Sequence, residues 1–140
     1  MTIAVPLEEL RGELESRGPS GYLLTAGPDG RPHCVAVEAA FSGDEIAMGA
    51  GNTSVRNAED RRLVALLFPP PAEGGYSLIV DGEVTSAVVA EDEGNSLSIR
   101  PSKAVLHRPG PAEGGGASVT GCGNDCVPVY SETGSTRAES

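Results

Sequence analysis

The chain has few aromatic residues, a single lysine (Lys103) and no long apolar run. Tryptophan is absent, and three Tyr and two Phe are the only aromatic residues among 140. Val, Leu, Ile and Ala must therefore fill the core. The length suits one domain with a single hydrophobic core.

The missing features exclude several classes of protein. No stretch approaches the roughly 20 apolar residues that a membrane-spanning helix needs, and the N-terminus has no basic region followed by an apolar core, as a secretory signal has. Three cysteines, an odd number, are not a disulfide scaffold. We therefore expect a cytoplasmic protein without a membrane partner.

Positive charge is also scarce. Ten Lys and Arg residues face 20 Asp and Glu residues, so the net charge is −10 at pH 7. Such a surface repels phosphate backbones, which excludes nucleic acid as a partner. A bound anion would need a local positive cluster. No Ser-His-Asp arrangement or carboxylate pair stands out, so no catalytic residue is assigned and chemistry would come from a cofactor.

Hydrophobic patterns predict a mainly β domain. Pro6 begins a short helix whose Leu7, Leu10 and Leu14 share one face. Strands are predicted over 22–26, 33–41, 46–50, 63–68, 77–90 and 97–109, the last two with bulges at Asp81-Gly82 and Pro101. About six strands without βαβ alternation predict a small closed barrel.

Three of these segments carry further detail. Asp29-Gly30 is typical of a tight hairpin turn. The apolar run 63–68 is typical of a strand buried on both faces. A second short helix is expected after residue 51, capped by Asn52, Thr53 or Ser54.

The second predicted strand alternates. His33, Val35 and Val37 lie on one face, and Cys34 with Glu38 on the other. His33 is either structural or in contact with a cofactor or substrate. The other histidine, His107, is a strand-end residue or a ligand of haem or metal.

The segment GNTSVRNAEDRR, residues 51–62, is the strongest candidate for an anion site. Helix-start N–H groups, the hydroxyls of Thr53 and Ser54 and the guanidinium of Arg56 form a compact donor set. Capping is the alternative role for these residues, and the two roles are compatible. We expect Arg62 to form a surface salt bridge; Arg61 either does the same or reaches a cofactor across a dimer.

Beyond Pro109 the composition changes to Gly, Ser, Pro and Thr. We therefore divide the chain into a domain at 1–109 and a flexible tail at 110–140. Cys122 and Cys126 lie in the tail with C-x-x-x-C spacing and no second pair, so we assign no metal site. The alternatives are a metal site with His107, a redox-sensitive thiol pair, or no role.

Three segments in sequence, GYLLTAGPDGRPHCVAV, GNTSVRNAEDRRLVALLF and GYSLIVDGEV, resemble the pyridoxamine 5'-phosphate oxidase-like FMN-binding split-barrel family. The likeness extends over about residues 7–108. It implies a six-stranded Greek-key split β-barrel with one or two short helices, which forms a homodimer. It also implies a cofactor site with the phosphate at one end and the isoalloxazine along the second strand, made of Thr53, Ser54, Arg56, Asn57, His33, Val35 and Val37.

The resemblance implies an oxidoreductase that uses FMN to pass hydride to or from a small organic substrate. Two alternatives use the same barrel: a deazaflavin-dependent reductase, and a non-catalytic flavin- or haem-binding carrier or sensor. True pyridoxamine-phosphate oxidases end in a segment with tryptophan and arginine. This chain has no tryptophan and ends in a Gly-rich segment, so we do not expect vitamin B6 oxidation.

Overall fold

The computed structural model describes residues 1–92 and 94–110, and the chain divides into two units, 1–108 and 109–140. Cys122, Cys126 and most of the predicted tail lie outside the described residues. All elements belong to the first unit: β1 (Thr2–Ala4), α1 (Leu7–Arg17), β2 (Ser20–Ala26), β3 (Pro32–Ser42), β4 (Glu45–Ala50), α2 (Asn52–Asp60), β5 (Leu63–Phe68), β6 (Ser77–Val88) and β7 (Asn95–His107). In this part of the chain, neither helix is long and apolar enough to cross a membrane.

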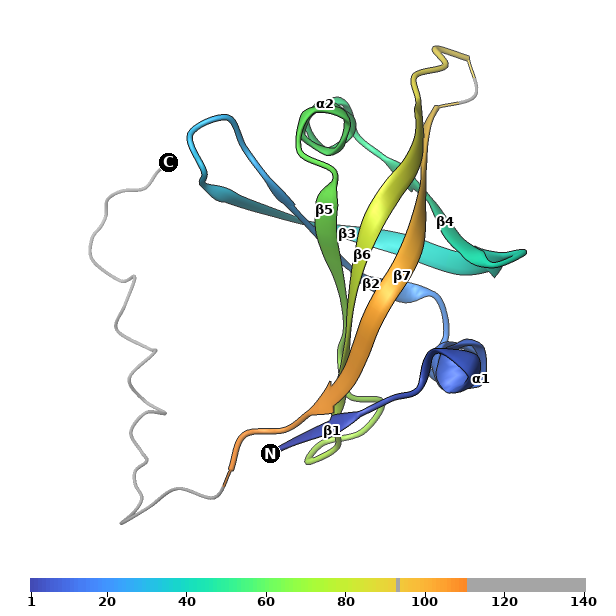
Figure 1. The fold of residues 1–140 in the computed structure, drawn as a ribbon, viewed down its shortest axis with the longest axis vertical. Coiled ribbons are helices and arrows are strands. Elements are labelled where there is room, and N and C mark those ends of the chain that lie inside the picture. The colour runs from blue at the N-terminus through green and yellow to red at the C-terminus, as the bar shows by residue number, and fades with distance from the viewer. Residues whose placement is uncertain (93, 111–140) are drawn as a thin grey trace. The chain divides into compact units, whose positions relative to one another are not determined.

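The strands form an antiparallel barrel. Their order is β7-β4-β3-β2-β5-β6, and β6 pairs again with β7 to close the ring (Figure 1). This confirms the predicted six-stranded barrel with two short helices. The short strand β1, which the sequence analysis missed, adds a seventh strand at the end of β7.

Alternate residues along each strand point into the barrel. On β3, Val37 and Ala39 are buried and Glu38 is exposed, as the alternation predicts. The prediction that β5 is buried on both faces is wrong: Val64 is buried, but Leu63 is 78% exposed. Apolar residues on β5 therefore form part of an outer surface as well as the core.

Helix α1 fills a gap in the barrel wall. One edge of β7 pairs with β4 at residues 95–99 and with β1 at residues 105–107, which leaves an interval between them. Helix α1 packs against β7 and β3, and it buries Leu10 and Leu14. Leu7, expected on the same face, is exposed because it begins the helix at the rim of this contact.

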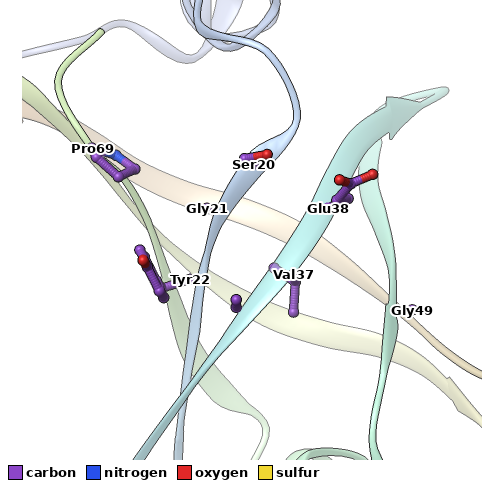
Figure 2. A pocket seen from close by; sticks show the side chains of 8 residues that line it. Ser20, Gly21, Tyr22, Val37, Glu38, Gly49 and Pro69 are labelled. Carbon is purple, nitrogen blue, oxygen red and sulfur yellow. The ribbon is translucent and has the colours of Figure 1, made fainter. Parts of the chain in front are cut away.

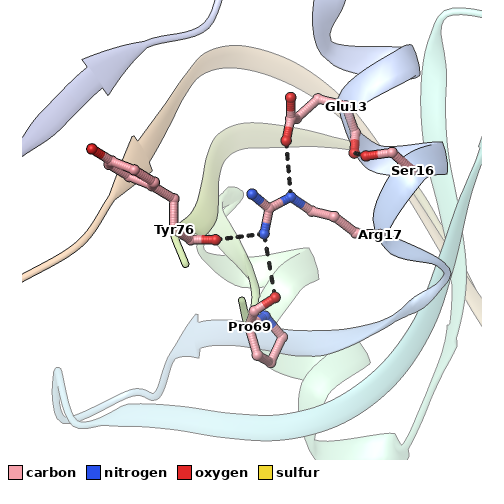
Figure 3. A network of polar contacts seen from close by, with 5 residues as sticks. All are labelled: Glu13, Ser16, Arg17, Pro69 and Tyr76. Atoms are coloured by element: carbon pink, nitrogen blue, oxygen red, sulfur yellow. Dashed lines mark hydrogen bonds and ion pairs between the residues drawn. The ribbon is translucent and has the colours of Figure 1, made fainter. Parts of the chain in front are cut away.

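A buried arginine at the end of α1 holds the loop between β5 and β6. Arg17 Nη1 donates to the carbonyl oxygen of Tyr76 at 2.7 Å and to that of Pro69 at 3.3 Å, while Nε donates to Glu13 Oε2 at 3.1 Å (Figure 3). Its side chain is only 6% exposed. These partners compensate the charge for its loss of solvent, so the loop has a defined position against α1.

Candidate functional site

The edge of β3 is open over half of its length. Strand β3 pairs with β2 from Pro32 to Glu38, but with β4 only from Ala39 to Ser42. The Ala39 N–H donates to Pro19 O on the β2 side. Because hydrogen-bonding direction alternates along a strand, the backbone groups of even-numbered residues face away from β2. Those at positions 34 and 36 therefore face an edge that has no strand partner among the described residues.

The opening exists because β4 leaves β3 and follows β7. Gly49 of β4 pairs with Ser96, and Ala50 pairs with Asn95. The chain then passes through Gly51 into α2, which covers one end of the barrel and packs against β2, β6 and β7 (Figure 1). The separation of β3 from β4 leaves a gap in the barrel wall, which we call the split. The open edge of β3 lies on one side of the split, and the start of α2 lies on the other.

The start of α2 presents free backbone donors. The N-cap is Gly51, which has no side chain to cap the helix. The prediction that Asn52, Thr53 or Ser54 is the cap is therefore wrong, and these residues form the first turn instead. The first helical bond runs from Val55 N to Gly51 O at 3.0 Å. The N–H groups of the first turn therefore have no acceptor within the helix. Together with the helix dipole, such groups favour an anion.

The four predicted phosphate residues fall on two sides of α2. Thr53 and Arg56 are exposed, and their spacing of three residues places them on one helix face. Ser54 and Asn57 are buried. Asn57 Nδ2 donates to Thr25 Oγ1 at 3.1 Å, which ties α2 to β2. Thr53 and Arg56 thus share the exposed face of α2, whereas Ser54 and Asn57 lie on the face that packs against the barrel.

The arginine pair after α2 has structural partners. Arg61 Nε donates to Ala26 O at 2.7 Å, and its Nη2 lies 4.0 Å from Asp60 Oδ2. Arg62 Nη1 donates to Val84 O at 2.8 Å. The salt bridge expected for Arg62 is therefore wrong, because its partner is a strand carbonyl. Both guanidinium groups fasten the end of α2 to the barrel.

Of the predicted ring-site residues, Val37 belongs to the core, and Val35 packs against it half-buried. His33 lies on the same face of β3, opposite Thr25. Its Nδ1 is a buried polar atom that has no hydrogen-bond partner within the described residues. An unpaired buried polar atom costs about 1–3 kcal/mol, so a ligand or water at this position would stabilise the protein.

The other titratable side chains considered in the sequence are those of His107 and Cys34. His107 ends β7, and its Nδ1 is 3.2 Å from Thr2 Oγ1 of β1, as a strand-end residue would be. Cys34 is exposed on the outer face of β3. No three His, Cys, Asp or Glu side chains gather as a metal site within residues 1–92 and 94–110.

A hollow of about 480 Å³ lies on the outer face of the barrel beside the split (Figure 2). Its lining is Ser20, Gly21, Tyr22, Ala36, Val37, Glu38, Gly49 and Pro69. The hollow therefore adjoins the open part of β3 at its Glu38 end. The split therefore has the first turn of α2, whose N–H groups lack acceptors within the helix, on one side. On the other side it has a strand edge without a strand partner among the described residues, and the hollow lies next to that edge.

Known proteins resemble this chain in sequence. It is 33% identical over 120 residues to an uncharacterized protein of Mycobacterium bovis and, to the same extent, to one of Mycobacterium tuberculosis. Each match covers 78% of this chain and 84% of the relative. No model of a known protein family matches the chain.

Solved structures share the fold. An F420 reductase is 22% identical, with a TM-score of 0.59 over 71% of this chain and 98% of that one. An FMN-binding protein from Syntrophomonas wolfei subsp. wolfei is 12% identical, with a TM-score of 0.60 over 75% and 88%. A protein of the pyridoxinephosphate oxidase family from Clostridium acetobutylicum is 13% identical, with a TM-score of 0.58 over 74% and 91%. This chain belongs to the family of the two mycobacterial proteins and has the pyridoxamine 5'-phosphate oxidase-like split-barrel fold, as its sequence segments predict.

Proposed function

We propose that the chain binds FMN at the split in the barrel and acts as an oxidoreductase on a small organic substrate. The observation that carries the proposal is that a helix start, whose first N–H groups have no acceptor within the helix, and an open strand edge lie on the two sides of the same split. The similar structures described as an FMN-binding protein and an F420 reductase support a cofactor of the flavin class.

The phosphate would be held at the start of α2. Thr53 and Arg56 are exposed on this helix, and they would add a hydroxyl and a guanidinium to the N–H donors of its first turn. Charge-assisted bonds to phosphate are about twice as strong as neutral ones. Ser54 and Asn57 would act indirectly, because they fix the helix against the barrel. On a chain of net charge −10, this local arrangement outweighs the general repulsion of anions.

The ring would lie along the open edge of β3. When bound, FMN supplies a centre that accepts and donates hydride. The backbone groups of Cys34 and Ala36 would fix the orientation of the ring through hydrogen bonds, and N–H donors at this edge would stabilise negative charge that develops there. His33, whose Nδ1 has no hydrogen-bond partner within residues 1–92 and 94–110, stands on the same strand and would complete the polar contacts.

We also expect the chain to form a homodimer through an exposed apolar surface. The outer faces of β2 and β5 carry Tyr22 and Leu63, both exposed, with the half-buried Leu24 and Leu67 beside them. Tyr22 is opposite Leu67 in the register of the two strands, so the apolar residues form a continuous surface. An exposed apolar patch of this kind marks an interface, and we infer a homodimer that buries Leu63, Leu24 and Leu67. Tyr22 lies at the border of this interface, where it also lines the hollow beside the split.

Arg56→Ala tests the phosphate site. We expect it to weaken FMN binding about tenfold or more, because a charge-assisted hydrogen bond contributes about 1.5–3 kcal/mol. Quenching of flavin fluorescence measures the affinity. Arg100→Ala is the matched control, since Arg100 is exposed on β7 and removes the same charge. Equal affinity of both variants for FMN would exclude Arg56 from the site.

Parallel titrations identify the cofactor. Uptake of FMN with a flavin absorption band supports the proposal, whereas uptake of F420 alone supports the second candidate, a deazaflavin-dependent reductase, which the likeness to F420 reductase favours. A Soret band after addition of haem would indicate the haem-binding alternative. A protein that remains colourless with all three would overturn the proposal. Turnover of a reduced nicotinamide with an electron acceptor then separates an enzyme from a carrier.

A further inference from the structure

The hollow beside the split is present because the small residues Ala36 and Gly49 lie between the larger side chains of Tyr22 and Glu38. Tyr22 and Ala36 are opposite each other on β2 and β3, and Ser20 is opposite Glu38 two pairs further along. The small side chain at position 36 and the absence of one at Gly49 leave the space open. Figure 2 shows Tyr22 and Pro69 together on one side of this space and Glu38 on another.

The walls of the hollow are fixed in place. Pro69 accepts a hydrogen bond from buried Arg17, as does Tyr76 of the same loop (Figure 3). The backbone at Gly21 lies so close to the core that a Cβ there would be 2.6 Å from Phe68 Cδ1. A ligand would therefore meet a preformed surface rather than a mobile one, which lowers the entropic cost of binding.

The side chains that line the hollow favour a positively charged ligand. The Tyr22 ring, Pro69 and the neighbouring small residues offer apolar contact to a flat group. The polar groups of the lining are the carboxylate of Glu38 and the hydroxyls of Ser20 and Tyr22, and none of the described residues that line it is Lys, Arg or His. With a net charge of −10 on the chain, this hollow attracts cations and repels carboxylates and phosphates. Its volume is within the range of about 300–1,000 Å³ for small-molecule sites.

We propose that this hollow is the substrate subsite and that it takes a small planar ring bearing a cationic group, with the ring against Tyr22 and the positive group at Glu38. As a substrate site the inference rests on the proposed flavin function, because the hollow adjoins the edge of β3 where the cofactor would lie. The carboxylate of Glu38 should make rings that bear phosphate or carboxylate poor ligands of this subsite.

Three probes of one shape test the charge preference: benzamidinium, neutral benzamide and anionic benzoate. Each is titrated into the full chain, with and without FMN, and followed by the backbone amide NMR signals. We expect benzamidinium to shift the amides of Tyr22, Glu38 and Gly49 and to bind about fivefold more tightly than benzamide. Benzoate should give no shift at these amides. Equal binding of benzamidinium and benzoate, or shifts that map elsewhere, would overturn the subsite.

Two variants separate charge from shape. Glu38→Gln should weaken benzamidinium about fivefold and leave benzamide unchanged. Gly49→Leu should abolish binding of both by filling the hollow, and it should fold, because a Cβ at this position meets only Asn95 O at an ordinary 3.6 Å. Glu83→Gln, which removes an exposed carboxylate from β6, is the control and should change neither affinity.

The two proposals fail in different ways. A chain that binds FMN but shows no charge preference in the hollow, or whose Glu38→Gln variant behaves as the parent, would overturn the subsite alone. A chain whose hollow prefers benzamidinium but which takes up no flavin would overturn the proposed function and leave a cation-selective pocket. The cofactor-free titration makes this distinction directly.

Discussion

The barrel wall has a closed side, where β6 pairs with β7, and an open side, where β3 separates from β4. The two sides differ in how much of the strand backbone is paired. Strand β6 pairs with β7 from Ser77↔His107 to Val88↔Ser96, whereas β3 pairs with β4 only from Ala39 to Ser42. On the closed side the ladder runs along the whole of β6 and nearly the whole of β7, with two shifts of register. On the open side, part of β3 and the first turn of α2 have backbone donors without a partner in the part of the chain that the structure describes. The continuous ladder therefore lies on one side of the barrel, and the proposed binding groups lie on the other.

The largest expected effect is on the closed side. A Cβ at Gly82 would collide with Ile99 Cγ2 and lie 2.9 Å from Arg100 O. Gly82→Val should therefore reduce the free energy of unfolding by about 3 kcal/mol, since the paired backbone cannot yield. Gly49→Val, on the open side, should change it by less than about 1 kcal/mol. Urea denaturation measures both, and equal losses would contradict the contrast between the two sides.

Arg17→Met should have an intermediate effect. The variant keeps the apolar stem but removes the donors to Pro69 O and Tyr76 O, which we expect to cost about 2 kcal/mol because these bonds carry a charge. The same change at Arg100, whose side chain is 61% exposed, should cost less than about 0.5 kcal/mol. Thermal unfolding of the two variants, side by side, gives the difference. A loss at Arg100 as large as that at Arg17 would count against a structural role for the buried guanidinium.

The smallest expected effect on the fold is at the outer apolar surface. Leu63→Gln should change the stability of the monomer by less than about 0.5 kcal/mol, because the side chain is already exposed. It should nevertheless raise the dissociation constant of the proposed homodimer tenfold or more, since each copy loses a buried leucine. Val89→Thr is the control, at a residue 61% exposed outside this surface. Sedimentation that gives the same dissociation constant for both variants would move the interface elsewhere.

Much of the fold was predictable because its signals are local. The alternation along 33–41 predicted which side chains of β3 enter the core, since the strand period is two wherever the strand lies. Asp29-Gly30 predicted the hairpin, and Gly30 has the positive φ of 82° that such a turn requires. The bulge expected at Asp81-Gly82 is present as a shift of register opposite Pro101. In each case neighbouring residues alone carry the information.

The sequence indicated a candidate anion site but not the orientation of its side chains. The segment 51–62 was identified from its hydroxyls and arginines, but its periodicity does not say which side of α2 faces the barrel. Small polar residues occupy both sides, so packing against β2, β6 and β7 decided that Asn57 is inside and Arg56 outside. Exposure of Leu63 could not be predicted either, because an apolar side chain suits a core and an interface equally.

The amino-acid sequence by itself determined the strands, the hairpins, the acidic character and the segment that carries Arg56, because these depend on residue type and short spacing. Only the tertiary structure decided where β3 loses its partner and which carbonyls engage Arg17, Arg61 and Arg62. It also decided that Tyr22 and Glu38 border one hollow. These features join residues far apart in the chain, and their positions depend on how the barrel closes, which no local pattern records.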